Sequence, residues 1–244
     1  MPFLSVDSLS LVDIAMLAII VIGLPLEALL TLKKGRAELA SGKPDVRVKH
    51  YTQTITLLWG ISIPILVIWA TSNRDWGMLG FQLETGPWAM AGWGLALLIA
   101  LFFISQYAMI SRSESMREQL RSGLSKNQIM SNFMPHTDAE RRVFNLMGIS
   151  AGIAEEIVFR GFLIWAFSNF LPIWAAAGLA LAVFTALHMY QGASQLPAVF
   201  MLGALVTLVY LLSGSLWPAI LLHIFVDLIN NSTVWKARAE PVSG

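Results

Sequence analysis

The sequence predicts an all-α membrane protein: a polytopic bundle of about seven transmembrane helices in one integral domain over residues 1–244. Only 13% of the residues are charged and 56% are hydrophobic, whereas soluble domains carry roughly 25% charged residues. The apolar residues gather in runs close to the ~20 that a helix needs to cross a bilayer. No run shows the alternation of a β-barrel strand. The chain has no cysteine, which excludes disulfides, thiolate metal sites and a cysteine nucleophile.

The apolar runs place the expected spans along the chain. We expect them at residues 10–32, 54–71, 87–110, 143–167, 171–190, 197–213 and 216–234, with room for an eighth or re-entrant segment. Pro172, Pro197 and Pro218 fall near span starts, where a first-turn proline is tolerated because its missing N–H would be unpaired anyway. Asp7 and Asp13 accompany the start of the first span without any basic residue, so we expect this span to be retained rather than cleaved as a signal peptide.

Basic residues between the spans predict the orientation. Two segments hold most of them: 33–50, with Lys33, Lys34, Arg36, Lys43, Arg47 and Lys49, and 111–142, with Arg112, Arg117, Arg121, Lys126, Arg141 and Arg142. Such segments lie in the cytoplasm. Seven spans then place the N-terminus outside and the C-terminus in the cytoplasm. Membrane sorting explains these residues, so no nucleic-acid partner is expected.

The segments have different expected roles. Residues 10–110 form scaffold helices, 143–234 the helices that carry the chemistry, and 111–142 a cytoplasmic connecting segment with a short helix before Gly123. The short loops favour a bacterial inner (plasma) membrane protein, with a site that opens to the cytoplasm and the lipid bilayer as its surroundings.

The last four spans contain very few charged side chains. From Val143 to Trp235 these are Glu155, Glu156, Arg160 and Asp227, joined by His188 and His223. Each charge at mid-membrane costs on the order of 3 kcal/mol on insertion scales. Because chance retention of such a set is improbable, we expect these side chains to face one another in a functional site.

Helical spacing assigns partners within the set. Glu156 and Arg160 are four residues apart and share a helix face, so we expect a buried ion pair. Glu155 is rotated by about 100° and lacks this partner. A desolvated carboxylate near cationic groups suits a general base.

The other two polar helices also present residues at a spacing of four. His223 and Asp227 share one face, and Phe184 and His188 share another. Three helices therefore offer groups to one site in the cytoplasmic half of the membrane. Their expected depths agree only if a helix breaks early or tilts.

Three motifs carry a resemblance to a known family. The segments "EEIVFR" at Glu155–Arg160, "FTALH" at Phe184–His188 and "HIFVD" at His223–Asp227 occur in order on successive apolar segments. Over residues 143–231 the chain resembles the CPBP group of CAAX prenyl endopeptidases and bacteriocin-processing proteins, also called the Abi family.

The resemblance implies an intramembrane endopeptidase that cleaves a membrane-associated or lipidated peptide or protein. In such an enzyme Glu155 and His188 activate a water, and His223 with residue 227 stabilises the oxyanion, while Glu156, Arg160 and Phe184 support them. The eukaryotic CAAX enzymes have asparagine where this chain has Asp227. Because an ionised aspartate cannot donate to an oxyanion, we expect Asp227 to orient His223 and to hold it as the imidazolium.

A metal is the first alternative for the site. Glu155, His188 and His223 are donor types of a two-histidine, one-glutamate zinc site. An H-E-x-x-H helix is absent, and ligation would remove Glu155 as the base. We expect catalysis to require no cofactor, with zinc on Glu155, His188 and His223 as the alternative.

Other readings differ in function class. The alternative function is a non-catalytic membrane scaffold or bacteriocin-immunity protein of the same fold. A proton-coupled transporter would show paired broken helices or an inverted repeat, and neither is visible. Ser150 lies in "GISAG", but a nucleophile elbow needs a strand-to-helix turn, so we interpret these small residues as helix packing. Substrate identity and oligomeric state are not determined by the sequence.

Overall fold

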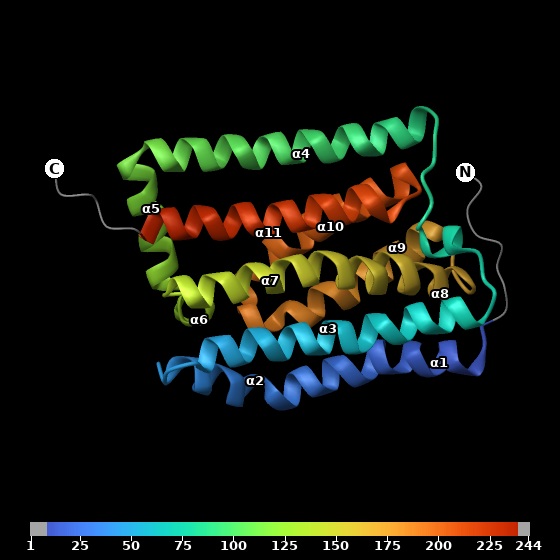
Figure 1. The fold of residues 1–244 in the computed structure, drawn as a ribbon, viewed down its shortest axis with the longest axis horizontal. Helices are drawn as coiled ribbons and strands as arrows, with labels where there is room; N and C mark the ends of the chain where they lie inside the picture. Colours follow the sequence, from blue (N-terminus) through green and yellow to red (C-terminus); the bar gives the residue numbers. More distant parts are fainter. Residues whose placement is uncertain (1–8, 239–244) are drawn as a thin grey trace.

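The computed structural model describes residues 9–238, and this part of the chain is helical without strands. The long helices lie side by side along one axis (Figure 1), so the predicted all-α bundle is confirmed. Asp7 lies outside the described residues. Five described helices are long and apolar enough to cross a membrane: Leu11–Ala40, Val46–Thr71, Pro87–Arg112, Ile173–Gln191 and Ala193–Ser213.

The two remaining expected spans carry two of the three motifs, those at Glu155–Arg160 and His223–Asp227. One consists of α7 (Asp138–Glu155), η3 (Glu156–Leu163) and α8 (Ile164–Ser168), and the other is α11 (Leu216–Arg238). Their polar side chains make them less apolar than the five. In Figure 1 they run beside the other long helices, with α7 packed against α3 (Val46–Thr71) and against α11. The number of crossings stays a prediction.

Several helices are longer than the expected spans. The first is continuous through α1 (Leu11–Ala18), η1 (Ile19–Gly23) and α2 (Leu24–Ala40), and α3 begins at Val46. Most basic residues of the segment 33–50 therefore lie in helix ends, and only residues 41–45 connect them. The helices exceed the predicted spans because they are longer than a bilayer core is thick. The 26 residues of α3 extend about 39 Å, whereas the hydrocarbon core, to which the apolar residues correspond, is ~30 Å thick.

The polar connecting segment is also mostly helical. After η2 (Trp76–Leu79) and α4 (Pro87–Arg112), the chain forms α5 (Glu114–Lys126) and α6 (Gln128–Phe133). The expected helix before Gly123 is wrong at its C-terminal end, because α5 continues to Lys126. A mid-helix glycine costs only about 1 kcal/mol relative to alanine, and the Ser113 side chain caps the start of α5.

The C-terminal half supplies two further helices that contact the polar motifs. They are α9 (Ile173–Leu187), which is followed by η4 (His188–Gln191) and η5 (Ala193–Gln195), and α10 (Leu196–Ser213), which precedes α11. Pro172 is the N-cap of α9, and Pro197 and Pro218 stand in the first turns of α10 and α11, as expected.

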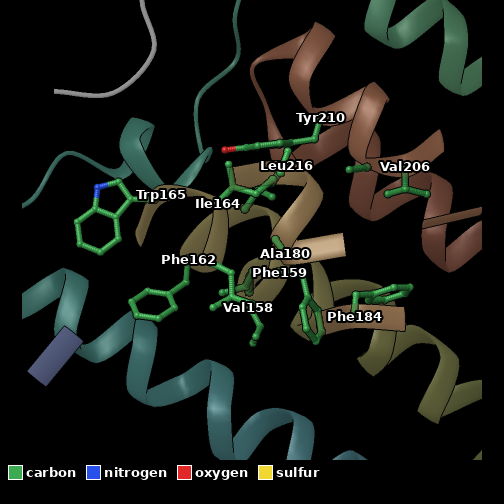
Figure 2. Packing of buried hydrophobic residues seen from close by; sticks show 14 of the residues in the cluster. Val158, Phe159, Phe162, Ile164, Trp165, Ala180, Phe184, Val206, Tyr210 and Leu216 are labelled. Atoms are coloured by element: carbon green, nitrogen blue, oxygen red, sulfur yellow. The ribbon is translucent and has the colours of Figure 1, made fainter. Parts of the chain in front are cut away.

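The main apolar core surrounds η3, whose eight residues are all buried. Figure 2 shows Phe159 and Phe184 close together in this core, and their ring centroids are 5.2 Å apart at 85°. Phe162 and Trp165 continue the core toward α3. The packing holds the beginning of η3, and with it the polar motif, in a fixed position.

Small residues let α7 and α11 approach each other. A Cβ atom on Gly152 would lie 2.5 Å from Ile224 Cγ1, and one on Gly148 would lie 3.2 Å from the Cβ atom of Asp227. Ser150, between them, lies inside α7 rather than on a strand-to-helix turn. The interpretation of "GISAG" as a packing segment is confirmed.

Candidate active site

A buried ion pair forms the base of the site. Arg160 Nη1 lies 2.8 Å from Glu156 Oε1, and the two side chains are 2% and 0% exposed, so the pair expected from the spacing is confirmed. Arg160 also donates from Nη2 to the Gly203 carbonyl at 3.0 Å and from Nε to Thr207 Oγ1 at 3.3 Å. These bonds attach η3 to α10 and offset the cost of burying the guanidinium.

Phe184 covers the same guanidinium. The Arg160 Cζ atom lies 4.6 Å from the centre of the Phe184 ring, which is within cation–π distance. A Cβ on Gly203 would lie 3.0 Å from this ring, so the glycine leaves the space that the phenyl group fills. Phe184 is thus a packing wall, as expected, and its contact with the cation was not foreseen.

Glu156 also orients one of the two histidines. His223 Nδ1 lies 2.7 Å from Glu156 Oε1, in a hydrogen bond in which the ring donates. Asp227 Oδ2 is 3.9 Å from His223 Nε2, too far for a hydrogen bond. The expectation that Asp227 orients His223 is therefore wrong. The side chain that accepts a hydrogen bond from the ring and orients it is Glu156. The contact joins residues 67 positions apart, so helical spacing could not reveal it.

His188 is held by its own helix. Its Nδ1 atom lies 2.8 Å from the carbonyl oxygen of Phe184. Because a carbonyl can only accept, Nδ1 carries a proton. The α-helix ends at Leu187, and His188 begins the 3-10 turn η4. This is a helix break of the kind expected if the polar groups of the three helices are to lie at one depth.

Glu155 lies between the two rings. Its Oε2 atom is 4.0 Å from His188 Nε2 and 3.9 Å from His223 Nε2. This oxygen is buried and has no hydrogen-bond partner among residues 9–238. The side chains of Glu155 and His188 are each 13% exposed, that of His223 is 10% and that of Asp227 is 34%. The structure therefore brings together all four residues predicted to be catalytic.

The helix that carries Glu155 changes its winding at the site. The α-helical hydrogen bonding of α7 ends at Glu155, and the next eight residues form the π-helix η3. Wider turns of this kind are frequent at functional sites. Here the change in winding falls between Glu155, which faces the histidine rings, and Glu156, which faces Arg160.

The residues do not fit a zinc ion as they are placed. Two ligands at 2.0–2.1 Å from a tetrahedral zinc lie about 3.3 Å apart, whereas Glu155 is 3.9–4.0 Å from the rings. Over residues 9–238 no three histidine, aspartate or glutamate side chains are grouped so that they could hold a metal.

One residue near the site belongs to residues 10–110, the part of the chain that was expected to be only scaffold. Arg36, on α2, donates from Nη2 to the carbonyl oxygens of Met189 at 2.8 Å and Tyr190 at 3.4 Å. These carbonyls belong to η4, the turn that begins with His188. In the sequence Arg36 is one of several basic residues beside a span, and nothing distinguishes it from Lys33 or Lys34.

A comparison with protein families agrees with the motifs. Residues 141–229 match the family model described as type II CAAX prenyl endopeptidase Rce1-like. The matched region includes all three motifs, so the resemblance to the CAAX endopeptidases, a protease family, is confirmed. No curated protein and no solved structure matches the chain.

Proposed function

We propose that this protein is an intramembrane endopeptidase that hydrolyses a peptide bond of a membrane-associated or lipidated peptide or protein. One observation carries the proposal: the Glu155 carboxylate lies within 4.0 Å of two imidazole Nε2 atoms. The other nitrogen of each ring is already hydrogen-bonded. The match of residues 141–229 to a family of endopeptidases supports the same reaction class.

Glu155 and His188 act on the attacking water. The 4.0 Å between Glu155 Oε2 and His188 Nε2 is too long for a direct hydrogen bond but suits one water between the two atoms. With the proton of His188 on Nδ1, its Nε2 atom is free to accept. The water donates a hydrogen bond to Glu155 and another to His188 Nε2. As its oxygen attacks the scissile carbonyl, one proton passes to Glu155 and the other stays on the attacking oxygen.

His223 stabilises the oxyanion that results. Its Nδ1–H is directed at Glu156, so a second proton on Nε2 points toward Glu155 and Asp227. The surrounding carboxylates favour the doubly protonated ring, which donates to the developing negative charge. After attack, Glu155 transfers the abstracted proton to the leaving amine.

Asp227 is the fourth member of the site and acts without a hydrogen bond to His223. Its carboxylate lies 3.9 Å from His223 Nε2, where it stabilises the imidazolium by charge. It is also the most exposed of the four, at 34%, so it faces the side from which substrate enters.

The membrane arrangement belongs to the same proposal. In this proposal the chain crosses a bacterial plasma membrane seven times, the end of the bundle with α5 and α6 faces the cytoplasm, and the site opens to that side. The basic residues of the segments 33–50 and 111–142 support this orientation. Five of the described helices are long and apolar enough to cross a membrane, which supports an integral membrane protein.

The test is peptide-library cleavage followed by mass spectrometry with purified protein. Glu155→Gln should nearly abolish cleavage, because the amide cannot take a proton, while Glu118→Gln on the exposed side of α5 should leave it unchanged. Each sample is assayed with and without a chelator. Equal cleavage by the wild type and Glu155→Gln would overturn the role of Glu155, and loss of wild-type cleavage in chelator would show that a metal is required.

A further inference from the structure

A second polar region lies at one end of the bundle. A cavity of about 440 Å³ opens where α6 is followed by α7 and where α11 ends, and it is lined by Ser131, Pro135, His136, Trp235 and Arg238. Trp235 is twelve residues beyond His223 on α11, which corresponds to about 18 Å along the helix axis. The cavity is therefore separate from the candidate active site, and no lining side chain is a carboxylate.

Arg238 has hydrogen-bond donors to spare in this cavity. Its Nη1 and Nη2 atoms donate to the carbonyl oxygens of Pro135 at 3.1 Å and Ser131 at 3.4 Å. A guanidinium has five N–H donors, so three are left for a ligand. Among residues 9–238 no carboxylate forms an ion pair with Arg238, and the two carbonyls do not neutralise its charge.

A second guanidinium lies against Trp235, one of the residues that line the cavity. Arg141 Cζ lies 5.0 Å from the centre of the Trp235 ring. Its Nε atom is buried and has no hydrogen-bond partner within the described part of the chain. The acid nearest in sequence, Glu140, already accepts from Arg47 at 3.2 Å and from the amide of His136 at 2.6 Å. Positive charge is therefore in excess around the indole ring.

We infer that this cavity binds the phosphate of an anionic phospholipid headgroup. Basic pockets between membrane helices on the cytoplasmic side bind such headgroups, and tryptophan is enriched at the membrane interface. Arg238 supplies N–H donors for the phosphate oxygens, and Arg141, against the Trp235 ring, adds positive charge beside them. The inference does not depend on proteolysis.

The inference is tested by lipid retention in native mass spectrometry and by thermal unfolding. The wild-type protein is placed in nanodiscs of phosphatidylcholine alone or with phosphatidylglycerol. We expect it to retain phosphatidylglycerol selectively and to unfold at higher temperature in its presence. Arg238→Gln and Arg141→Gln should each bind it about fivefold more weakly, the factor that about 1 kcal/mol per basic residue gives.

The matched control is Arg142→Gln, which removes the same charge from the exposed neighbour of Arg141. It should retain the lipid as the wild type does. Equal losses in Arg142→Gln and Arg238→Gln would overturn the inference, because surface charge alone would then explain binding. Protection by soluble glycerol phosphate equal to that by phosphatidylglycerol, or binding of an acidic peptide but not the lipid, would also overturn it.

Discussion

At the residue scale, the neighbours of Glu156 determine how the site is held. One oxygen of this buried carboxylate contacts both Arg160, at 2.8 Å, and His223, at 2.7 Å. Glu156 thereby connects the arginine that is fixed to α10 with the histidine of α11. The family resemblance marks Glu156 only as a supporting residue, whereas in the geometry it is the common partner of Arg160 and His223.

Replacing Glu156 should affect stability and turnover together. Glu156→Gln leaves the Arg160 guanidinium buried without its counter-charge, which costs about 3–5 kcal/mol. We expect a large fall in the unfolding temperature. The double variant Glu156→Gln with Arg160→Met should recover most of it, because no unpaired charge remains. A single variant as stable as the wild type, in thermal unfolding in detergent, would contradict the role of the pair.

Asp227 leads to a different expectation. Its carboxylate makes no hydrogen bond to His223, so the ring should keep its orientation without it. Asp227→Asn should retain part of the turnover, since the charge that stabilises the imidazolium is lost but the amide can donate to the oxyanion, whereas His223→Ala should reduce turnover about 10²–10³-fold. Steady-state cleavage rates provide the measurement. If Asp227→Asn were as inactive as His223→Ala, the Asp227 charge itself would be essential.

At the element scale, the α7–α11 contact depends on Gly152. Its Cβ position lies 2.5 Å from Ile224 Cγ1 and 2.8 Å from the Ile224 backbone nitrogen, and backbone cannot move aside easily. Gly152→Ala should cost about 1–3 kcal/mol, as overpacking does, and should displace the neighbouring His223 from Glu156. Gly94→Ala, on α4 with no atom within 4 Å of its Cβ position, is the matched control and should be neutral or stabilising. Equal unfolding temperatures for the two variants would show that α7 and α11 can separate without cost.

The turn after α9 provides a second prediction at this scale. Arg36 donates to the Met189 and Tyr190 carbonyls, and η4 begins with His188, so Arg36 is a positioning residue for that ring. Arg36→Ala should lower kcat with little change in KM, and Arg36→Lys should recover part of it. Lys34→Ala, at an 82% exposed side chain nearby, should change neither constant. A fall in KM and kcat of equal size in the Arg36 and Lys34 variants would assign the effect to surface charge instead.

The limits of the sequence are clearest for contacts between elements. Spacing along one helix correctly paired Glu156 with Arg160, and the rarity of charges in apolar segments identified Glu155, His188 and His223 as one set. The contact of His223 with Glu156 could not be predicted, because it depends on how closely α7 and α11 approach. The predicted spans are shorter than the helices for a related reason. Hydropathy identifies only the apolar residues that suit lipid, whereas helical hydrogen bonding continues into the polar residues beyond them.

At the scale of the whole molecule, the absence of cysteine makes the topology directly testable. A single introduced cysteine can be labelled with a membrane-impermeant thiol reagent without background. Ser41→Cys, in the turn before α3, should be labelled only from the cytoplasm, and Ser72→Cys, after α3, only from outside, because exposed residues at opposite ends of one crossing face opposite compartments.

The informative position is Ser194, in the exposed turn between α9 and α10. If α7, η3 and α8 together cross the membrane, as seven crossings require, Ser194→Cys is labelled from the cytoplasm like Ser41→Cys. If only the five most apolar helices cross, the side reverses and Ser194→Cys is labelled from outside like Ser72→Cys. We expect the cytoplasmic pattern, because the ion pair between Glu156 and Arg160 and the hydrogen bonds of Arg160 to α10 compensate the two charges internally and so lower the cost of placing this segment in lipid.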